Sequence, residues 1–124
     1  MSEHTPTIAV VDDEQEILTM IERFLTRDRA YRVTTYLNPV SALERIGRDV
    51  DLVLLDVMMP QMDGLELLRQ LHERNPELKI VIMTAYSTLD KVLNAHRYGA
   101  TSYVMKPFAS LDALRREIDD VLKS

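Results

Sequence analysis

Three carboxylates, a hydroxyl and an amine stand at the ends of short apolar runs of the chain: Asp12, Asp13, Asp56, Thr84 and Lys106. Carboxylates that pack together repel one another unless they are protonated or neutralised, and one lysine cannot offset three of them. A divalent cation can, and all-oxygen ligands suit Mg2+, which is typically held by one or two carboxylates and a substrate phosphate. If the fold gathers these residues, they predict a site for a phosphoryl group that arrives with its metal.

Asp56 is the candidate nucleophile of such a site. It ends the apolar run LVLLD, where an unpaired carboxylate is costly and a purely structural role is the minority interpretation. Its carboxylate can form an aspartyl-phosphate while Mg2+ and Lys106 balance the charge on the transferring oxygens. A hydrogen bond from Thr84 to the phosphoryl group would then distinguish the modified protein, as a switch requires. Taken singly, Asp12 and Asp13 fit helix capping equally well, and Thr84 and Lys106 are commonplace at a strand end and on a surface.

The short apolar runs predict five strands, at residues 7–11, 31–36, 52–55, 79–83 and 101–105. Three of these runs (IAVV, LVLL and IVIM) are continuously apolar, which is typical of strands covered by helices on both faces. The second run alternates more, as an edge strand does.

Helical spacing between the runs predicts five helices. The first has an apolar stripe of Ile17, Met20, Ile21, Phe24 and Leu25. Asp13 with Glu16 indicates a capping box at its start. In the second, Asn38 and Pro39 are expected as N-cap and first residue, with an inner side formed by Val40, Leu43 and Ile46.

The third helix should carry Leu65, Leu68 and Leu71 inward and end before Pro76. Ser87 with Asp90 offers a capping box to the fourth helix, and Gly99 stands where a left-handed residue is expected at its end. The last helix begins at about Ser110, and its apolar stripe is Leu111, Leu114, Ile118, Val121 and Leu122.

Strand and helix alternate five times, which favours a parallel sheet with right-handed crossovers and helices on both faces. The predicted fold class is therefore α/β, a three-layer doubly wound sandwich of five parallel strands. We expect one domain over residues 1–124 with a short loose tail at residues 1–5. Ligands in such sheets bind beyond the carboxyl ends of the strands, where all five candidate residues would meet.

The composition excludes or disfavours several classes of site and partner. The chain contains no cysteine, which excludes a disulfide framework and any Cys-ligated metal site. Its formal charge of -5 argues against direct nucleic-acid binding by this domain, although not by a neighbouring one. The start MSEHTPTIAVV has no basic leader, and its apolar run is too short for a membrane span, so we expect no membrane contact and a cytoplasmic location.

Four motifs carry a resemblance to a known family: VVDDE at 10–14, LLDVMMPQMDG at 54–64, MTAY at 83–86 and GATSYVMKPF at 99–108. Over its whole length the chain resembles the receiver domain of two-component response regulators. The resemblance implies a flavodoxin-like fold with strand order 2-1-3-4-5. It also implies a phosphorelay protein that catalyses its own phosphorylation and slow dephosphorylation, without turning over a separate substrate.

The resemblance assigns the acidic residues. Asp56 would accept the phosphoryl group from a phosphohistidine of a sensor histidine kinase. Asp13 and Asp56 would bind Mg2+ together with the main-chain carbonyl of Met58, and Asp12 would act mostly through water.

The resemblance also assigns the residues of a conformational switch. Thr84 resembles the switch hydroxyl, and Lys106 resembles the phosphate-binding lysine, joined to Pro107 by a cis peptide. Tyr103 matches the aromatic residue that rotates inward when the hydroxyl moves, although a strand tyrosine is more often half-buried packing.

Two interpretations stand for the face formed by the fourth helix, fifth strand and fifth helix. Its mixed charges are typical of a solvated face, whereas in this family the same face binds an output partner or forms a phosphorylation-dependent homodimer. These charged residues are Asp90, Lys91, Arg97, Arg115, Arg116, Asp119 and Asp120. The chain ends at VLKS, so a stand-alone receiver and one excised from a transcription factor, effector enzyme or hybrid kinase are both consistent with the sequence.

Two other functions fit the same fold class less well. A phosphohydrolase similar to the haloacid dehalogenase family needs an aspartate two residues after the nucleophile, where this chain has Met58. A flavodoxin-type flavin module needs hydroxyls and amides in its first loop, where this chain has Asp12, Asp13 and Glu14.

Overall fold

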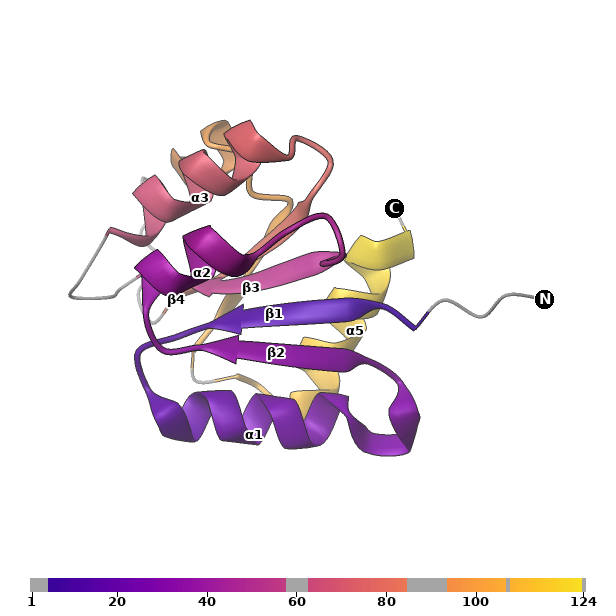
Figure 1. The fold of residues 1–124 in the computed structure, drawn as a ribbon. Coiled ribbons are helices and arrows are strands. Elements are labelled where there is room, and N and C mark those ends of the chain that lie inside the picture. The colour runs from indigo at the N-terminus through magenta and orange to yellow at the C-terminus, as the bar shows by residue number, and fades with distance from the viewer. Residues whose placement is uncertain (1–4, 58–62, 85–93, 107, 124) are drawn as a thin grey trace.

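The computed structural model describes residues 5–57, 63–84, 94–106 and 108–123 (Figure 1). The strands are β1 (Thr7–Val11), β2 (Arg32–Tyr36), β3 (Leu52–Asp56), β4 (Lys79–Thr84) and β5 (Ser102–Met105). They form one sheet of order β2-β1-β3-β4-β5 in which each neighbouring pair is parallel. The predicted five-stranded parallel sheet and its 2-1-3-4-5 order are confirmed.

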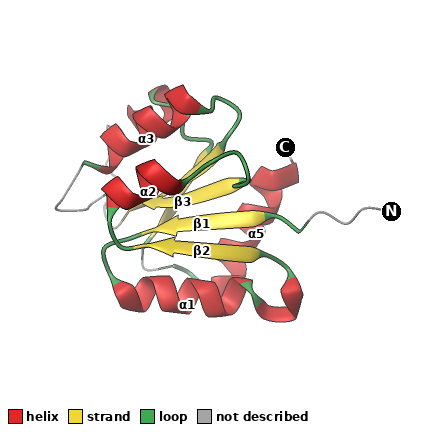
Figure 2. Ribbon diagram, in the orientation of Figure 1, coloured by secondary structure: helices red, strands yellow, loops and turns green. Residues whose placement is uncertain are grey.

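Helices cover both faces of this sheet, as Figure 2 shows. The helices α1 (Gln15–Leu25) and α5 (Leu111–Lys123) share one core with one face. The helices α2 (Pro39–Arg45) and α3 (Gly64–Arg74) share a second core with the other face. The molecule is therefore the three-layer α/β sandwich that the sequence predicts. Within the described residues, no helix is long and apolar enough to cross a membrane.

The central strands are buried because helices cover both of their faces. All residues of β3 are buried, as are those of β1 and β4 apart from the first residue of each. The edge strands β2 and β5 have half-buried or exposed residues instead. The difference between continuous and alternating patterns in the sequence is confirmed.

Predicted helix ends agree with the structure at three places. The Asn38 side chain accepts a hydrogen bond from the Val40 N–H at 2.8 Å, so Asn38 caps α2 as expected. Helix α3 ends at Arg74 with Asn75 as its C-cap, before Pro76. Gly99 has a φ of 111°, the left-handed conformation that a glycine adopts without strain.

Other predictions were wrong. The N-cap of α1 is Glu14, without a side-chain capping bond, so the expected capping box of Asp13 and Glu16 is absent. Val40 is 45% exposed, because the short helix α2 turns Pro39 and Ala42 toward the core instead. In α3, Leu65, Leu68 and Leu71 pack against the core as predicted, with Leu65 only partly buried, but the fully buried Leu67 was not predicted.

Two observed strand ends differ by one residue from the predicted ends, and both lie at the candidate site. Strands β3 and β4 extend one residue further than predicted, so that Asp56 and Thr84 are their last residues. These two side chains are therefore held by the sheet and not by a loop. Residues 1–4 of the expected tail and the capping box at Ser87 and Asp90 lie outside the described residues.

Candidate functional site

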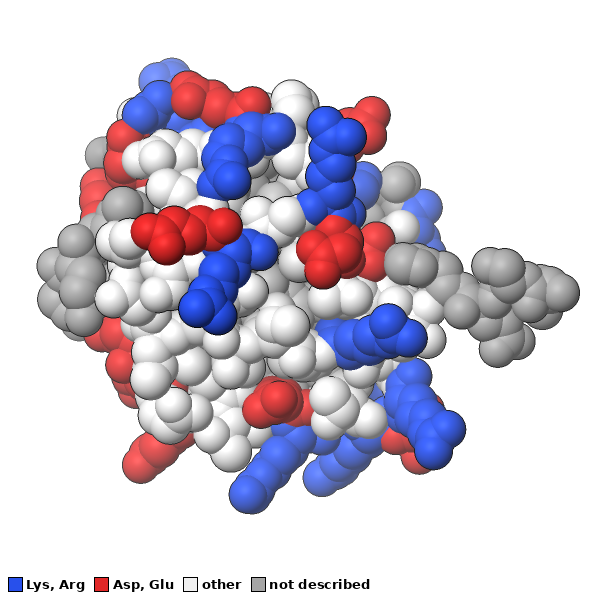
Figure 3. Space-filling model, in the orientation of Figure 1, with Lys and Arg blue, Asp and Glu red and all other residues white. Residues whose placement is uncertain are grey.

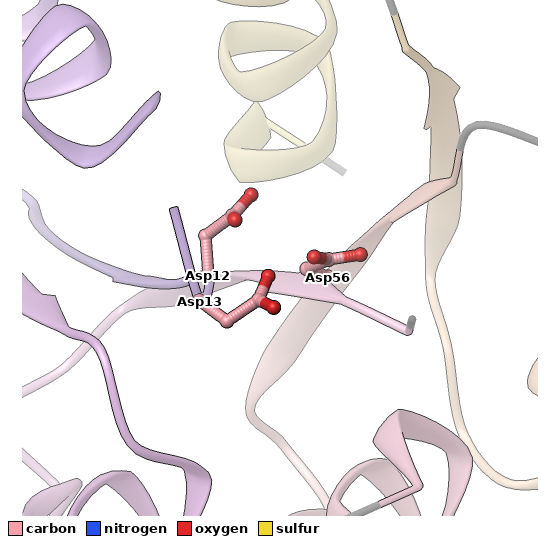
Figure 4. A group of neighbouring side chains, drawn as sticks. All are labelled: Asp12, Asp13 and Asp56. Atoms are coloured by element: carbon pink, nitrogen blue, oxygen red, sulfur yellow. The ribbon is translucent and has the colours of Figure 1, made fainter. Parts of the chain in front are cut away.

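Three carboxylates meet at the carboxyl edge of the sheet. Asp12 and Asp13 directly follow β1, and Asp56 ends the neighbouring strand β3. One oxygen of each carboxylate lies within 4.8 Å of the other two. Asp12 is 0% exposed and Asp56 3% exposed, whereas Asp13 is accessible to solvent. Figure 4 shows the Asp13 and Asp56 carboxylates turned toward each other and the Asp12 carboxylate directed away toward a helix.

Main-chain hydrogen bonds hold the two buried aspartates in place. The Asp12 N–H donates to the Tyr36 carbonyl at 3.1 Å, which extends the pairing of β1 with β2. The Val57 N–H, next to Asp56, donates to the Met83 carbonyl at 3.2 Å and extends the pairing of β3 with β4. The carboxylates are thus positioned by regular sheet geometry.

Gly64 allows α3 to begin directly against this strand end. A Cβ at this position would lie 2.3 Å from the Val57 Cα and 2.7 Å from the Asp56 carbonyl oxygen. Only glycine avoids this clash with main-chain atoms, which cannot move without displacing Asp56. We did not predict this role from the sequence; the signal for it was a glycine at a helix start eight residues after the candidate nucleophile.

Lys106 is the cation of the site. Its ammonium nitrogen lies 2.5 Å from Asp12 Oδ2 and 3.5 Å from Asp56 Oδ2. Its main-chain N–H donates to the Thr84 carbonyl at 2.8 Å, so the end of β4 fixes where the lysine begins. Burial by itself would lower the pKa of Lys106. The hydrogen bond to Asp12 and the charges of Asp56 and Asp12 outweigh burial and raise this pKa above its ordinary value.

Thr84 and Tyr103 lie on the neighbouring strands. Thr84 is 1% exposed at the end of β4, and Tyr103 on the edge strand β5 pairs with Ile82 of β4. The Tyr103 side chain is 45% exposed, and a cavity of about 310 Å³ lies beside it. The cavity is lined by Ile82, Ala95, His96, Ala100, Thr101, Ser102 and Tyr103.

The donor set suits a hard divalent cation. Three carboxylates have oxygens within 4.8 Å of one another, and among the described residues Lys106 is the cation paired with two of them, which leaves excess negative charge at this edge of the sheet. Oxygen ligands of this kind are those that Mg2+ prefers, and the accessible Asp13 provides an entry side. The residues present therefore fit a Mg2+ ion. The expected Met58 carbonyl ligand and Pro107 lie outside the described residues.

The expected partner face is only partly as predicted. The Glu117 side chain of α5 accepts a hydrogen bond from the Ser102 hydroxyl, and so joins α5 to β5. Arg115 lies on another side of α5, with its guanidinium 5.9 Å from the ring centroid of Tyr31, which precedes the opposite edge strand. Arg115 is therefore not part of the β5 face, because residues two apart on a helix point to different sides. Asp90 and Lys91 lie outside the described residues.

Together, the fold and the site define a doubly wound α/β domain with an acidic site at the carboxyl edge of its sheet. The family model for the response regulator receiver domain matches residues 8–119. The chain belongs to this family, so the family resemblance in the sequence is confirmed.

Individual relatives agree. The chain is 38% identical over 123 residues to the transcriptional regulatory protein ZraR of Klebsiella oxytoca, which covers 98% of the chain and 27% of ZraR. It is 42% identical over 100 residues to the DNA-binding transcriptional regulator NtrC of Escherichia coli, which covers 80% of the chain and 21% of NtrC. The chain thus spans about a quarter of the length of these curated relatives.

Solved structures give the same result for the fold. The BeF3-activated receiver domain of DrrB superimposes with a TM-score of 0.87 at 32% identity, covering 98% of this chain and all of that one. DrrB is described as a Thermotoga maritima homologue of OmpR and PhoB. The flavodoxin-like fold expected from the resemblance is therefore confirmed.

Proposed function

We propose that this receiver domain takes a phosphoryl group from a phosphohistidine of a sensor histidine kinase onto Asp56. One observation carries the proposal: Asp56 ends a strand of the sheet as a member of the acidic cluster, with the Lys106 ammonium 3.5 Å from its Oδ2. An Asp56 oxygen attacks phosphorus, a P–O bond forms, and the P–N bond breaks with its electron pair leaving on the imidazole.

The proposed transfer uses Mg2+ as its cofactor. Asp13 and Asp56 would bind it with the main-chain carbonyl of Met58, and Asp12 would act mostly through water. When bound, the ion neutralises the charge on the transferring phosphoryl oxygens. Lys106 contributes the remaining positive charge at a fixed position, because its main chain is tied to the end of β4.

The switch is proposed to run from Thr84 to Tyr103. A hydrogen bond from the Thr84 hydroxyl to the phosphoryl group exists only in the modified protein, so it stabilises one conformation selectively. The cavity beside Tyr103 gives this ring a place to rotate into. The surface of β5 and α5 would change with it and bind an output partner or a second copy of the domain.

In this proposal, the function that the switch controls is carried out by another domain or protein. NtrC, which is named as a DNA-binding transcriptional regulator, is about four times as long as the chain, so a comparable DNA contact would come from another part of such a protein. The receiver itself contacts no nucleic acid or membrane, works in the cytoplasm, and turns over no separate substrate.

Intact mass spectrometry tests the transfer chemistry. The wild type and two variants, Asp56→Asn and the matched control Asp49→Asn, are incubated with acetyl phosphate with and without Mg2+. Asp49 is exposed in the turn before β3, at the opposite edge of the sheet. We expect one phosphoryl group, only with Mg2+, on the wild type and on Asp49→Asn but not on Asp56→Asn.

Two results would contradict the proposal. Phosphorylation that persists in Asp56→Asn would move the acceptor elsewhere. Steady release of phosphate from p-nitrophenyl phosphate, with turnover well beyond one per protein molecule, would favour a phosphohydrolase.

A further inference from the structure

Asp12 and Asp13 are neighbours in the chain but have different surroundings. Both carboxylate oxygens of Asp12 already have a donor: Oδ1 accepts from the Glu14 N–H at 2.9 Å, and Oδ2 pairs with the Lys106 ammonium at 2.5 Å. The Asp12 side chain is 0% exposed. Asp13 is accessible to solvent and turned toward Asp56, whereas Asp12 is directed away (Figure 4).

The Asp12 carboxylate is held by a main-chain N–H, and Lys106 is held both at its main chain and at its ammonium group. The Glu14 N–H holds the Asp12 carboxylate in the turn between β1 and α1. The Lys106 main chain is bound to Thr84, so a flexible four-carbon stem is all that lies between that anchor and the ammonium. Asp12 is 1.0 Å nearer to the ammonium than Asp56 is, from the two distances of 2.5 and 3.5 Å.

We propose that Asp12 is a positioning residue that acts through Lys106. It holds the ammonium at 3.5 Å from Asp56 Oδ2, beside the place where phosphoryl oxygens would arrive, so that Asp56 shares the lysine with Asp12 and is not its nearest carboxylate. Asp13, in contrast, is the residue of the pair that sets Mg2+ affinity. This inference rests on the proposed function for its kinetic consequence, but the contact itself exists in the unphosphorylated protein.

The first test separates maximal rate from metal dependence. Phosphorylation by acetyl phosphate is measured across Mg2+ concentrations for Asp12→Asn, Asp13→Asn and the control Asp49→Asn. Asp12→Asn should lower the maximal rate by about tenfold and leave the half-saturating Mg2+ concentration within about twofold of wild type. Asp13→Asn should raise that concentration by about tenfold or more. Recovery of the wild-type rate in Asp12→Asn at high Mg2+ would overturn the proposal, because Asp12 would then act as a metal ligand.

A double-mutant cycle tests whether Asp12 acts through the lysine. If it does, adding Asp12→Asn to Lys106→Met should change the maximal rate by less than about twofold, since the shared interaction is already lost. A further loss as large as that of Asp12→Asn alone would show that Asp12 has a separate role. Asp12→Glu, which keeps the charge, should recover part of the rate.

Nuclear magnetic resonance tests the contact without any phosphorylation. The chain has four lysines, Lys79, Lys91, Lys106 and Lys123, so a sample labelled with 13C at lysine Cε gives few signals to assign. Asp12→Asn should shift the Lys106 signal and narrow it as the ammonium gains mobility, while Asp13→Asn should leave it nearly unchanged. Equal effects of the two variants would overturn the proposal, even in a protein that accepts no phosphoryl group.

Discussion

The same ion-pair distance occurs in two regions of the molecule with different surroundings. On α3, Arg69 Nη2 lies 2.5 Å from Glu66 Oε1, and Arg69 Nη1 lies 2.7 Å from Glu73 Oε1. At the strand ends, Lys106 lies 2.5 Å from Asp12. The side chains of Arg69 and Glu66 are 42% and 40% exposed, whereas those of Lys106 and Asp12 are 13% and 0% exposed. Distance is therefore a poor guide to the strength of these pairs.

Burial decides what each pair does. Exposed charges are screened by water, and such pairs contribute about 0–1 kcal/mol to stability. Figure 3 shows acidic and basic side chains interspersed over one face of the molecule, where they are in contact with solvent. A buried pair gains little net stability either, but it cannot lose one partner cheaply, because the remaining charge has no water around it. The α3 network, which is Arg69 with Glu66 and Glu73, should thus be replaceable without loss of stability. The strand-end cluster, which is Lys106 with Asp12 and Asp56, should instead need a cation to offset its buried carboxylates.

The largest effect should come from removing that cation. Lys106→Met leaves Asp12 and Asp56 buried without their ammonium, and we expect the free energy of unfolding to fall by about 3 kcal/mol. Urea denaturation without divalent metal measures this loss. Lys79→Met, at the opposite edge of the sheet, is the control for loss of a lysine. A Lys106 variant as stable as wild type would mean that solvent screens the strand-end cluster as it screens α3.

Mg2+ should stabilise the folded domain by neutralising the same carboxylates. At a free concentration one hundred times the dissociation constant, the gain is about 2.7 kcal/mol. The gain should persist in Arg69→Gln and be largely lost in Asp13→Asn, and thermal denaturation with and without Mg2+ measures it. A similar gain in Asp13→Asn would place the ion elsewhere.

Alkaline pH should weaken the strand-end cluster. The pKa of Lys106 is raised in the folded protein above its usual 10.5, so the folded state binds this proton more tightly than the unfolded state does. The stability it contributes is therefore fully present below about pH 10.5 and is lost as the pH rises through the folded pKa. Urea midpoints of wild type and Lys106→Met from pH 9 to 12 should converge. All other side chains are common to the two proteins, so their contribution cancels in the difference.

The smallest effect is expected on α3. Arg69→Gln removes both contacts to Glu66 and Glu73, yet the urea midpoint should hardly change, because these groups remain hydrated. The hydrogen bond to Arg69 lowers the pKa of Glu66, so its ionised form should also become slightly less favoured in this variant. A fall in the urea midpoint close to that of Lys106→Met would show that exposed pairs in this protein are as strong as buried ones.

Local patterns were sufficient to predict most of the fold. Continuous apolar runs predicted the central strands, and Asn38 and Gly99 predicted helix ends, because these signals depend on neighbours in the chain. Contacts across elements were missed. Val40 was expected inside and Leu67 was not singled out, because the buried face of a helix depends on what packs against it.

In the candidate site, too, some features followed from the sequence and others only from the tertiary structure. The sequence by itself determined which chemical groups stand at the strand ends, since Asp12, Asp13, Asp56, Thr84 and Lys106 each follow or end an apolar run. Only the tertiary structure decided that Lys106 pairs with Asp12, 94 residues away, more closely than with Asp56. It also decided that Gly64 must lie against the strand that carries Asp56. The physical reason is that parallel strands bring distant chain positions to one edge, where separations of about 1 Å determine which charges pair.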